Sequence, residues 1–268
     1  MRRIFTALAA AALLAAVPAV AQAPGSPPTY ANGLRLSLGY DGSVILKVLD
    51  VRINAQVANG GYHADVRLVS SGILALFKRL DQRASVDGVV QGGIAQPRTF
   101  QHRNLNSRAV RVVWGAGEVN TYATPAYPNM GTPPASQAQR LEATDPLTQA
   151  VRISLTFEGR NPCGQTLRVF DGKQRYDLVL SAGAARGADR REQRIGLTET
   201  AGCTLQYREV AGFRPKPPDQ RNQGIRGTVR VGFGRLGRGG PWVLSSLRAP
   251  TLLGDAVIEL REAQVRYP

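Results

Sequence analysis

Residues 34–68 read LRLSLGYDGSVILKVLDVRINAQVANGGYHADVRL, and this stretch predicts how the whole chain folds. Apolar and polar residues alternate along it, first up to Asp41-Gly42, then from Val44 to Val57, and again after Asn59-Gly60-Gly61. A period of two puts every second side chain on one face of a β-strand, and an Asn-Gly pair between two such runs is a strong hairpin signal. The stretch therefore predicts an antiparallel meander with one buried face.

Most of the remaining chain shows the same alternation. The further strand-like runs are residues 96–103, 109–114, 166–170, 175–180, 194–198, 203–210, 225–233, 242–247 and 254–267. Helices do not alternate with strands, which argues against a doubly wound nucleotide-binding fold. We therefore expect a mainly β fold in a single domain over residues 34–268, with a strongly curved antiparallel sheet or half-open barrel and one or two short helices.

Two segments have helical features instead. Residues 72–80 (GILALFKRL) carry apolar side chains at helical spacing, which predicts a short helix or a sharp bend. Thr144-Asp145-Pro146 is typical of a helix start, with Thr144 or Asp145 as the N-cap and proline in the first turn. Proline-rich or arginine-rich stretches predict irregular loops over residues 121–139, 181–192 and 213–223.

The first 23 residues have the features of a secretory signal peptide. Arg2-Arg3 precedes an apolar run over residues 4–20, and Ala21-Gln22-Ala23 is a small-x-small cleavage pattern. The run is short and rich in alanine for a membrane anchor, and it ends in a cleavage site, so we favour a cleaved signal over an anchor. We expect cleavage after Ala23, a flexible leader over residues 24–33, and a periplasmic protein that is not an integral membrane protein.

Cys163 and Cys203 are the two cysteines of the chain. In an oxidising compartment an even number of cysteines usually pairs, whereas a redox or metal role needs a CxxC motif or a Cys/His cluster that the sequence lacks. We therefore expect a Cys163–Cys203 disulfide rather than two free thiols. Closing a loop of ~40 residues would stabilise the fold by roughly 4 kcal/mol.

The chain is strongly basic, with 34 Lys+Arg against 19 Asp+Glu and a formal charge of +15. Cleavage would remove Arg2 and Arg3 and leave +13. The planar donor fork of arginine suits anions, but arginine-favouring codons would give the same composition. Export and the low content of aromatic residues argue against nucleic acid as a partner. An envelope lipid, lipopolysaccharide or an envelope protein is the expected partner.

Eight arginines form two clusters that are candidates for anion binding. These residues are Arg186, Arg190, Arg191 and Arg194 in the first cluster, and Arg226, Arg230, Arg235 and Arg238 along a glycine-rich stretch in the second. Arginine binds phosphate and carboxylate groups through two parallel hydrogen bonds. Solvated strand faces and loops are the alternative explanation of both clusters.

The sequence motifs that could indicate catalysis or cofactor binding lack the neighbouring elements that such sites need. Residues 232–237 match G-x-G-x-x-G, but another strand-like run follows where a dinucleotide site needs a helix. His63 and His102 lie in expected strands, without a nucleophile or a metal-ligand motif beside them. Asp145 is explained as a helix cap and Asp171 as a turn residue. We therefore expect no enzyme, no catalytic residues, no cofactor and no metal site.

Several segments together resemble one known family. They are Gly60-Gly61-Tyr62, residues 71–77 (SGILALF), residues 144–148 (TDPLT), Cys163 with residues 168–178 (RVFDGKQRYDL), and Cys203 with residues 210–213 (VAGF). The chain resembles the domain-of-unknown-function 3108 family of bacterial exported proteins over roughly residues 38–267. The resemblance implies an exported β-rich domain with a disulfide, without established catalytic residues or a defined ligand. The chain departs from the family at residues 40–43, which lead into a strand without a longer glycine-rich hairpin.

These observations predict a non-enzymatic periplasmic protein of the cell envelope that binds or carries a lipid-like or anionic ligand. The expected architecture is similar to the curved, half-open barrels of periplasmic lipoprotein carriers, although a fold alone does not determine function. A structural module that docks another envelope protein is the alternative. A hydrolase of envelope polymers is the least favoured interpretation, because the chain has two histidines and no nucleophile motif.

Overall fold

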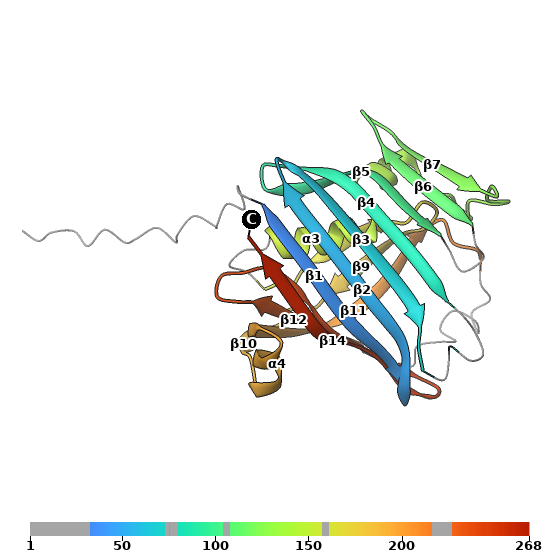
Figure 1. The fold of residues 1–268 in the computed structure, drawn as a ribbon. Coiled ribbons are helices and arrows are strands. Elements are labelled where there is room, and N and C mark those ends of the chain that lie inside the picture. The colour runs from blue at the N-terminus through green and yellow to red at the C-terminus, as the bar shows by residue number, and fades with distance from the viewer. Residues whose placement is uncertain are drawn as a thin grey trace, which may run out of the picture.

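The computed structural model describes residues 33–72, 75, 80–103, 108–156, 161–215 and 227–267. The chain forms one 14-stranded antiparallel sheet that curves around a helix (Figure 1). The two edge strands, β7 (Val119–Thr124) and β8 (Thr166–Phe170), do not pair with each other in the described part of the chain, so the sheet is open. The expected mainly β fold with a curved antiparallel sheet is therefore confirmed.

The first half of the sheet is a meander of consecutive strands. They are β1 (Leu34–Val44), β2 (Leu46–Ala58), β3 (Gly61–Ser70), β4 (Asp81–Gln91), β5 (Ile94–Arg103), β6 (Ala109–Trp114) and β7. Alternation in β1 buries Leu34, Leu36 and Leu38 on the inner face, as predicted. However, β1 continues through Asp41-Gly42 and reverses only at Ile45. The alternating runs did not predict β4, where small residues dilute the apolar side and Val86 is fully buried.

The second half of the sheet ends in a strand that pairs with the first strand of the first half. Its strands are β8, β9 (Arg175–Leu180), β10 (Ala185–Gly187), β11 (Leu197–Ala211), β12 (Val229–Leu236), β13 (Trp242–Thr251) and β14 (Gly254–Arg266). The last strand, β14, pairs antiparallel with β1, with Leu36 opposite Val265 and Val44 opposite Ala256. This pairing joins both halves into one continuous sheet.

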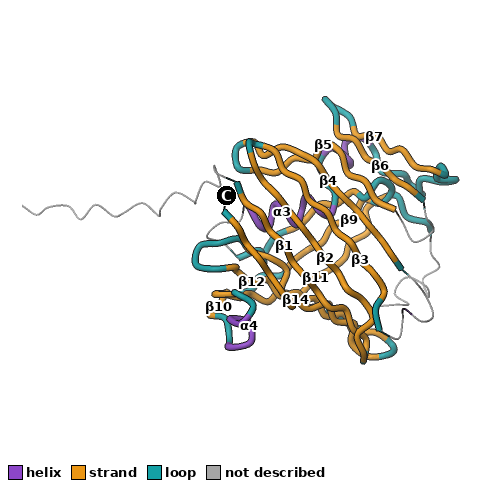
Figure 2. The backbone as a smooth tube through the Cα atoms, viewed as in Figure 1, coloured by secondary structure: helices purple, strands orange, loops and turns teal. Residues whose placement is uncertain are grey.

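The helix after Asp145 forms as predicted and lies inside the curve of the sheet. This helix, α3 (Pro146–Thr156), contacts β5 and β13, which are far apart in the strand order (Figure 2). Asp145 is fully buried, and its carboxylate accepts a hydrogen bond of 2.9 Å from the backbone N–H of Thr148. The cap therefore fixes where α3 begins, and the helix covers part of the concave face.

Two short helices lie where irregular loops were expected, so those loop predictions are wrong in part. The helix α4 (Arg190–Arg194) and the strand β10 interrupt residues 181–192, and Arg194 ends α4 instead of starting a strand. Most of β7 and the first three residues of the helix α2 (Gln137–Leu141) lie within residues 121–139. A capping box starts each helix, from Asp189 with Glu192 and from Ser136 with Gln139. This spacing was the missed signal.

Cys163 and Cys203 form the expected disulfide, with a Cα–Cα distance of 5.8 Å. The disulfide ties the segment before β8 to β11. The expected signal peptide and nearly all of the leader lie outside the described residues, as do most of residues 72–80 and of residues 213–223. In the described part of the chain, no helix has the length and apolar character needed to cross a membrane.

Candidate functional site

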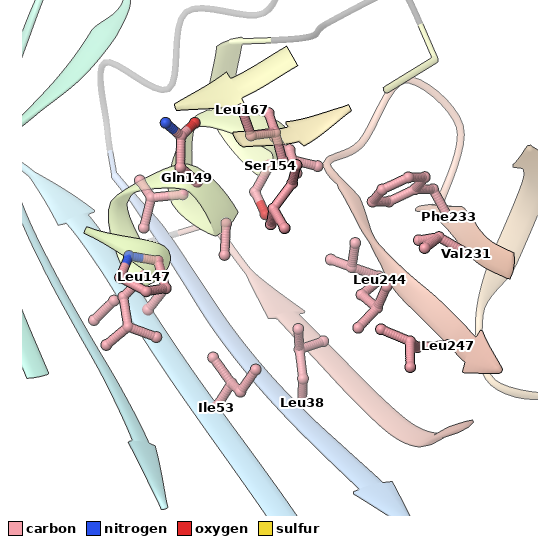
Figure 3. A pocket seen from close by; sticks show the side chains of 18 of the residues that line it. Leu38, Ile53, Leu147, Gln149, Ser154, Leu167, Val231, Phe233, Leu244 and Leu247 are labelled. Carbon is pink, nitrogen blue, oxygen red and sulfur yellow. The ribbon is translucent and has the colours of Figure 1, made fainter. Parts of the chain in front are cut away.

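An apolar cavity of about 240 Å³ lies between α3 and the inner face of the sheet (Figure 3). Its walls come from both halves of the sheet and from one side of the helix. Lining residues at its different walls include Leu38, Ile53, Leu147, Leu167, Phe233 and Leu247. Strand alternation produces this lining, because every second side chain of each strand faces inward. The cavity exists because α3 fills only part of the space that the curved sheet encloses.

Polar groups are few in this cavity. Of its described lining side chains, only Tyr40, Gln149 and Ser154 carry nitrogen or oxygen atoms, and none is charged. The Gln149 amide donates a hydrogen bond of 2.7 Å to the backbone oxygen of Arg168, so its nitrogen already has a partner outside the cavity lining. Burial raises the pKa of Tyr40, which keeps its hydroxyl neutral. The cavity therefore suits hydrocarbon and disfavours ions.

A buried polar chain holds α3 in its position over the cavity. The hydroxyl of Thr148 donates to Asp145, and the Tyr62 hydroxyl lies 2.7 Å from the same Thr148 oxygen. Because Thr148 uses its proton on Asp145, Tyr62 is the donor to Thr148. Burial raises the pKa of Asp145 to about 6. Arg152 adds a bond of 2.8 Å from its Nε to the backbone oxygen of Ala95 in β5.

The eight candidate arginines are only partly brought together. Arg186 pairs with Glu192 at 2.9 Å, and Arg191 pairs with Glu259 at 2.8 Å. Arg226 lies outside the described residues, while the remaining exposed members are Arg190, Arg194, Arg230 and Arg238. No arginine lines the apolar cavity in the described part of the chain.

Arg235 does not belong to an exposed anion site, which corrects the sequence-based grouping. Its side chain is buried over the ring of Trp242, at 4.8 Å, and its Nε lies 2.7 Å from a carboxylate oxygen of Glu199. Proximity along the sequence does not show that a neighbouring aromatic ring covers a charged side chain. Arg235 therefore contributes to packing.

Two of the candidates, Arg186 and Arg230, do meet in a second hollow of about 540 Å³ on the outer face of the sheet, together with Arg248. Ion pairs already occupy Arg186, with Glu192, and Arg248, with Asp255 at 3.1 Å, whereas Arg230 forms no ion pair with a described residue. Hydroxyl groups surround the three arginines, from Ser181, Thr200, Thr204, Ser245 and Ser246. The Thr200 hydroxyl is buried and has no hydrogen-bond partner among the described residues.

The other residues singled out in the sequence have structural explanations. The glycine motif lies in β12 and its turn into β13, and a side chain at Gly234 would meet Leu197 at 2.5 Å. The carboxylate of Asp171 accepts bonds from the backbone N–H groups of Lys173 and Gln174, which confirms its role in a turn. Within the described ranges, no three His, Cys, Asp or Glu side chains form a group that could hold a metal.

Sequence reasoning left open whether the sheet encloses a cavity. The strands that line it were mostly predicted, and so was α3, but the alternating pattern does not say how much space remains between them. The relevant signal is the small size of residues on the cavity side of α3, such as Ala150 and Ser154. Small residues at these positions indicate a cavity only when the position of α3 relative to the sheet is known.

Comparison with known proteins gives little similarity. No family model matches the chain, and no curated protein matches it. A crystal structure described as a beta-barrel-like protein of domain of unknown function DUF1849 from Brucella abortus is similar, with a TM-score of 0.43 and 12% identity over 87% of this chain and 98% of that one. No conclusion about a ligand follows from similarity at this level. The resemblance to the domain-of-unknown-function 3108 family stays a prediction.

Proposed function

We propose that this protein is a non-enzymatic binding protein that takes the hydrocarbon chain of a lipid-like ligand into the cavity beneath α3. The observation that carries this proposal is the lining: aliphatic and aromatic side chains from both halves of the sheet, with no charged group among the described residues. Pockets that bind small molecules are typically lined by apolar side chains, with a few polar groups that fix the orientation of the ligand. Binding in this cavity would be driven by burial of apolar surface.

The size of the cavity favours a ligand with a narrow acyl chain over a bulky ligand. An apolar cavity of roughly 150 Å³ admits a molecule as large as benzene, and typical small-molecule pockets range over about 300–1,000 Å³. At about 240 Å³, this cavity fits a segment of an acyl chain better than a ring system with polar substituents. The polar head of such a ligand would remain outside. The arginines first considered as its partners do not line the cavity.

An apolar ligand in this cavity would gain dispersion contacts with its walls. Protein interiors are close-packed, and an unfilled apolar cavity forfeits dispersion contacts that a ligand would restore. The helix above it is held by the buried chain of Asp145, Thr148 and Tyr62, so α3 is fixed at its start. A periplasmic location, expected from the first 23 residues, would place the protein among envelope lipids.

Binding of a fluorescent long-chain fatty acid to the mature chain tests this proposal. Ala150→Phe and Ser154→Leu each place a larger apolar side chain in the cavity, and we expect each to weaken binding at least tenfold while the fold is retained. Ala109→Phe, on the exposed face of β6, is the matched control and should bind like the wild type. Equal binding by both cavity variants would overturn the proposal. So would failure of the folded wild type to bind.

A second candidate function is anion binding in the outer hollow. It is favoured by Arg230, which has no ion-pair partner among the described residues, and by the unbonded Thr200 hydroxyl beside it. Titration with inorganic phosphate should give binding that Arg230→Ala abolishes and that Arg238→Ala, an exposed arginine outside the hollow, leaves intact. Equal loss of phosphate binding in both variants would show that binding depends only on the net charge of the protein.

A further inference from the structure

The most exposed large hydrophobic side chains of the described chain are concentrated at one place. Ile45 is 84% exposed, Leu253 74%, Leu252 62% and Leu46 59%, and every other described large hydrophobic side chain is less exposed. Ile45 lies between β1 and β2 and Leu46 is the first residue of β2, whereas Leu252 and Leu253 form the turn between β13 and β14. We call these four residues the apolar tip.

The two turns are neighbours although some 200 residues separate them. Strand β1 pairs with β14 up to the contact of Val44 with Ala256, which is the last pair before both turns. A Cβ atom built on Gly254 would lie 3.8 Å from Cγ1 of Ile45. In Figure 1 both turns project from the lower end of the sheet. The four residues therefore lie on two adjacent turns at one end of the sheet.

Turn chemistry does not explain these residues. Tight turns between strands select glycine, asparagine and aspartate, because these residues tolerate positive φ or bond to the local backbone. Ile45 has a φ of 64°, a conformation that is unfavourable for a β-branched residue. Leu252 and Leu253 likewise occupy turn positions at which polar residues are usual. Neither the turns nor the core of this chain gains from four exposed aliphatic side chains.

We infer that the apolar tip inserts into the surface of a lipid membrane. Four side chains on two projecting turns are too few for a protein interface, which takes about 20–30 residues on each side. They are sufficient for shallow insertion at the boundary between headgroups and acyl chains, where each buried aliphatic group adds to binding.

The described charged side chains next to the apolar tip, Lys47 and Arg248, form ion pairs, and this indicates the kind of surface that the tip fits. Lys47 lies 2.8 Å from Asp41 and 2.6 Å from Asp50, and Arg248 pairs with Asp255. Among the residues that the structure describes, the tip therefore offers no excess of positive charge to an anionic membrane. Insertion should depend on the acyl region of the bilayer and only weakly on the headgroup charge or on salt.

Apolar residues on the inner face of the sheet extend from the cavity to the tip. Leu247 lines the cavity and pairs across the sheet with Ile258, which in turn pairs with Gly42. The next row outward, Ala249, Ala256 and Val44, lies on the same inner face and ends at the tip. Transfer of a lipid chain along these residues rests on the proposed function. Insertion of the tip into a membrane is independent of that function.

Flotation of the mature protein with phosphatidylcholine vesicles tests the inference. Ile45→Asn with Leu253→Asn removes two apolar side chains, and asparagine tolerates the positive φ at residue 45. We expect the wild type to float, and the double variant to show at least tenfold weaker vesicle binding without a lower melting temperature. Ile94→Ser with Leu141→Ser, two exposed apolar residues elsewhere in the fold, should float like the wild type.

Three results would overturn membrane insertion: a wild type that does not float, a tip variant that floats equally well, or flotation that needs anionic lipid and disappears in high salt. Fatty-acid binding measured without vesicles separates this inference from the proposed function. The tip variant should retain it, because its substitutions lie outside the cavity.

Discussion

The carboxyl group of Asp145 caps α3 while it lies out of contact with solvent. Because burial raises its pKa from 3.8 to about 6, the folded protein holds a proton there that the unfolded chain releases above about pH 4. The stabilisation by this group is therefore complete below pH 4 and is lost as the pH rises towards 6. A shift of this size corresponds to about 3 kcal/mol.

Asp145→Asn tests this pH dependence. Asparagine keeps an oxygen that can accept the Thr148 N–H bond but removes the titration, so the free energy of unfolding of the wild type should fall relative to that of the variant by about 2–3 kcal/mol between pH 4 and pH 7. Urea unfolding at both pH values measures the difference. A gap that stays constant with pH would show that the carboxyl titrates normally.

Arg235 gives a second prediction at this scale. Arg235→Ala removes a buried stem from the Trp242 ring and leaves Glu199 unpaired, so unfolding should become easier by about 1–3 kcal/mol. Arg238→Ala, at an exposed position, should change stability by less than about 0.5 kcal/mol. Equal effects in urea unfolding would mean that Arg235 is as solvated as its neighbour. Proximity along the glycine-rich stretch grouped both arginines, because proximity in sequence does not show where a tryptophan lies.

Among the elements, the disulfide links the segment that precedes β8 to β11, next to strands that line the cavity. The two cysteines are 40 residues apart in sequence, so the cross-link removes a large loop entropy from the unfolded chain. Replacing Cys163 and Cys203 together by serine should lower the free energy of unfolding by about 2–5 kcal/mol. Urea unfolding of both forms measures this, and a stability unchanged within error would contradict it.

Elements with a strong local signal were predicted, and the others were not. The helix after Asp145 has a cap and a proline in its first turn, and β1 to β3 have regular alternation. By contrast, β4 carries small residues on its inner side, and the five-residue helices α2 and α4 are too short for apolar periodicity. Their capping boxes were present, but a capping box without an apolar run after it is a weak signal.

At the scale of the whole molecule, the strand order and the position of α3 create the features on which function depends. The pairing of β1 with β14 brings the two apolar turns together, and it places Leu38 and Leu247 at one cavity. Sequence reasoning gave the curved sheet and the helix against it. It gave neither the cavity nor the apolar tip, because both depend on pairing between residues about 200 positions apart, which alternation within a single strand does not encode.

The most direct measurement is a set of intermolecular NOEs between a long-chain fatty acid and the methyl groups of the folded protein. Binding beneath α3 predicts contacts from the acyl chain to Leu38, Leu147 and Leu244, which face one another across the cavity (Figure 3). Contacts confined to Ile45, Leu252 and Leu253, or no contacts at saturating fatty acid, would contradict binding in the cavity.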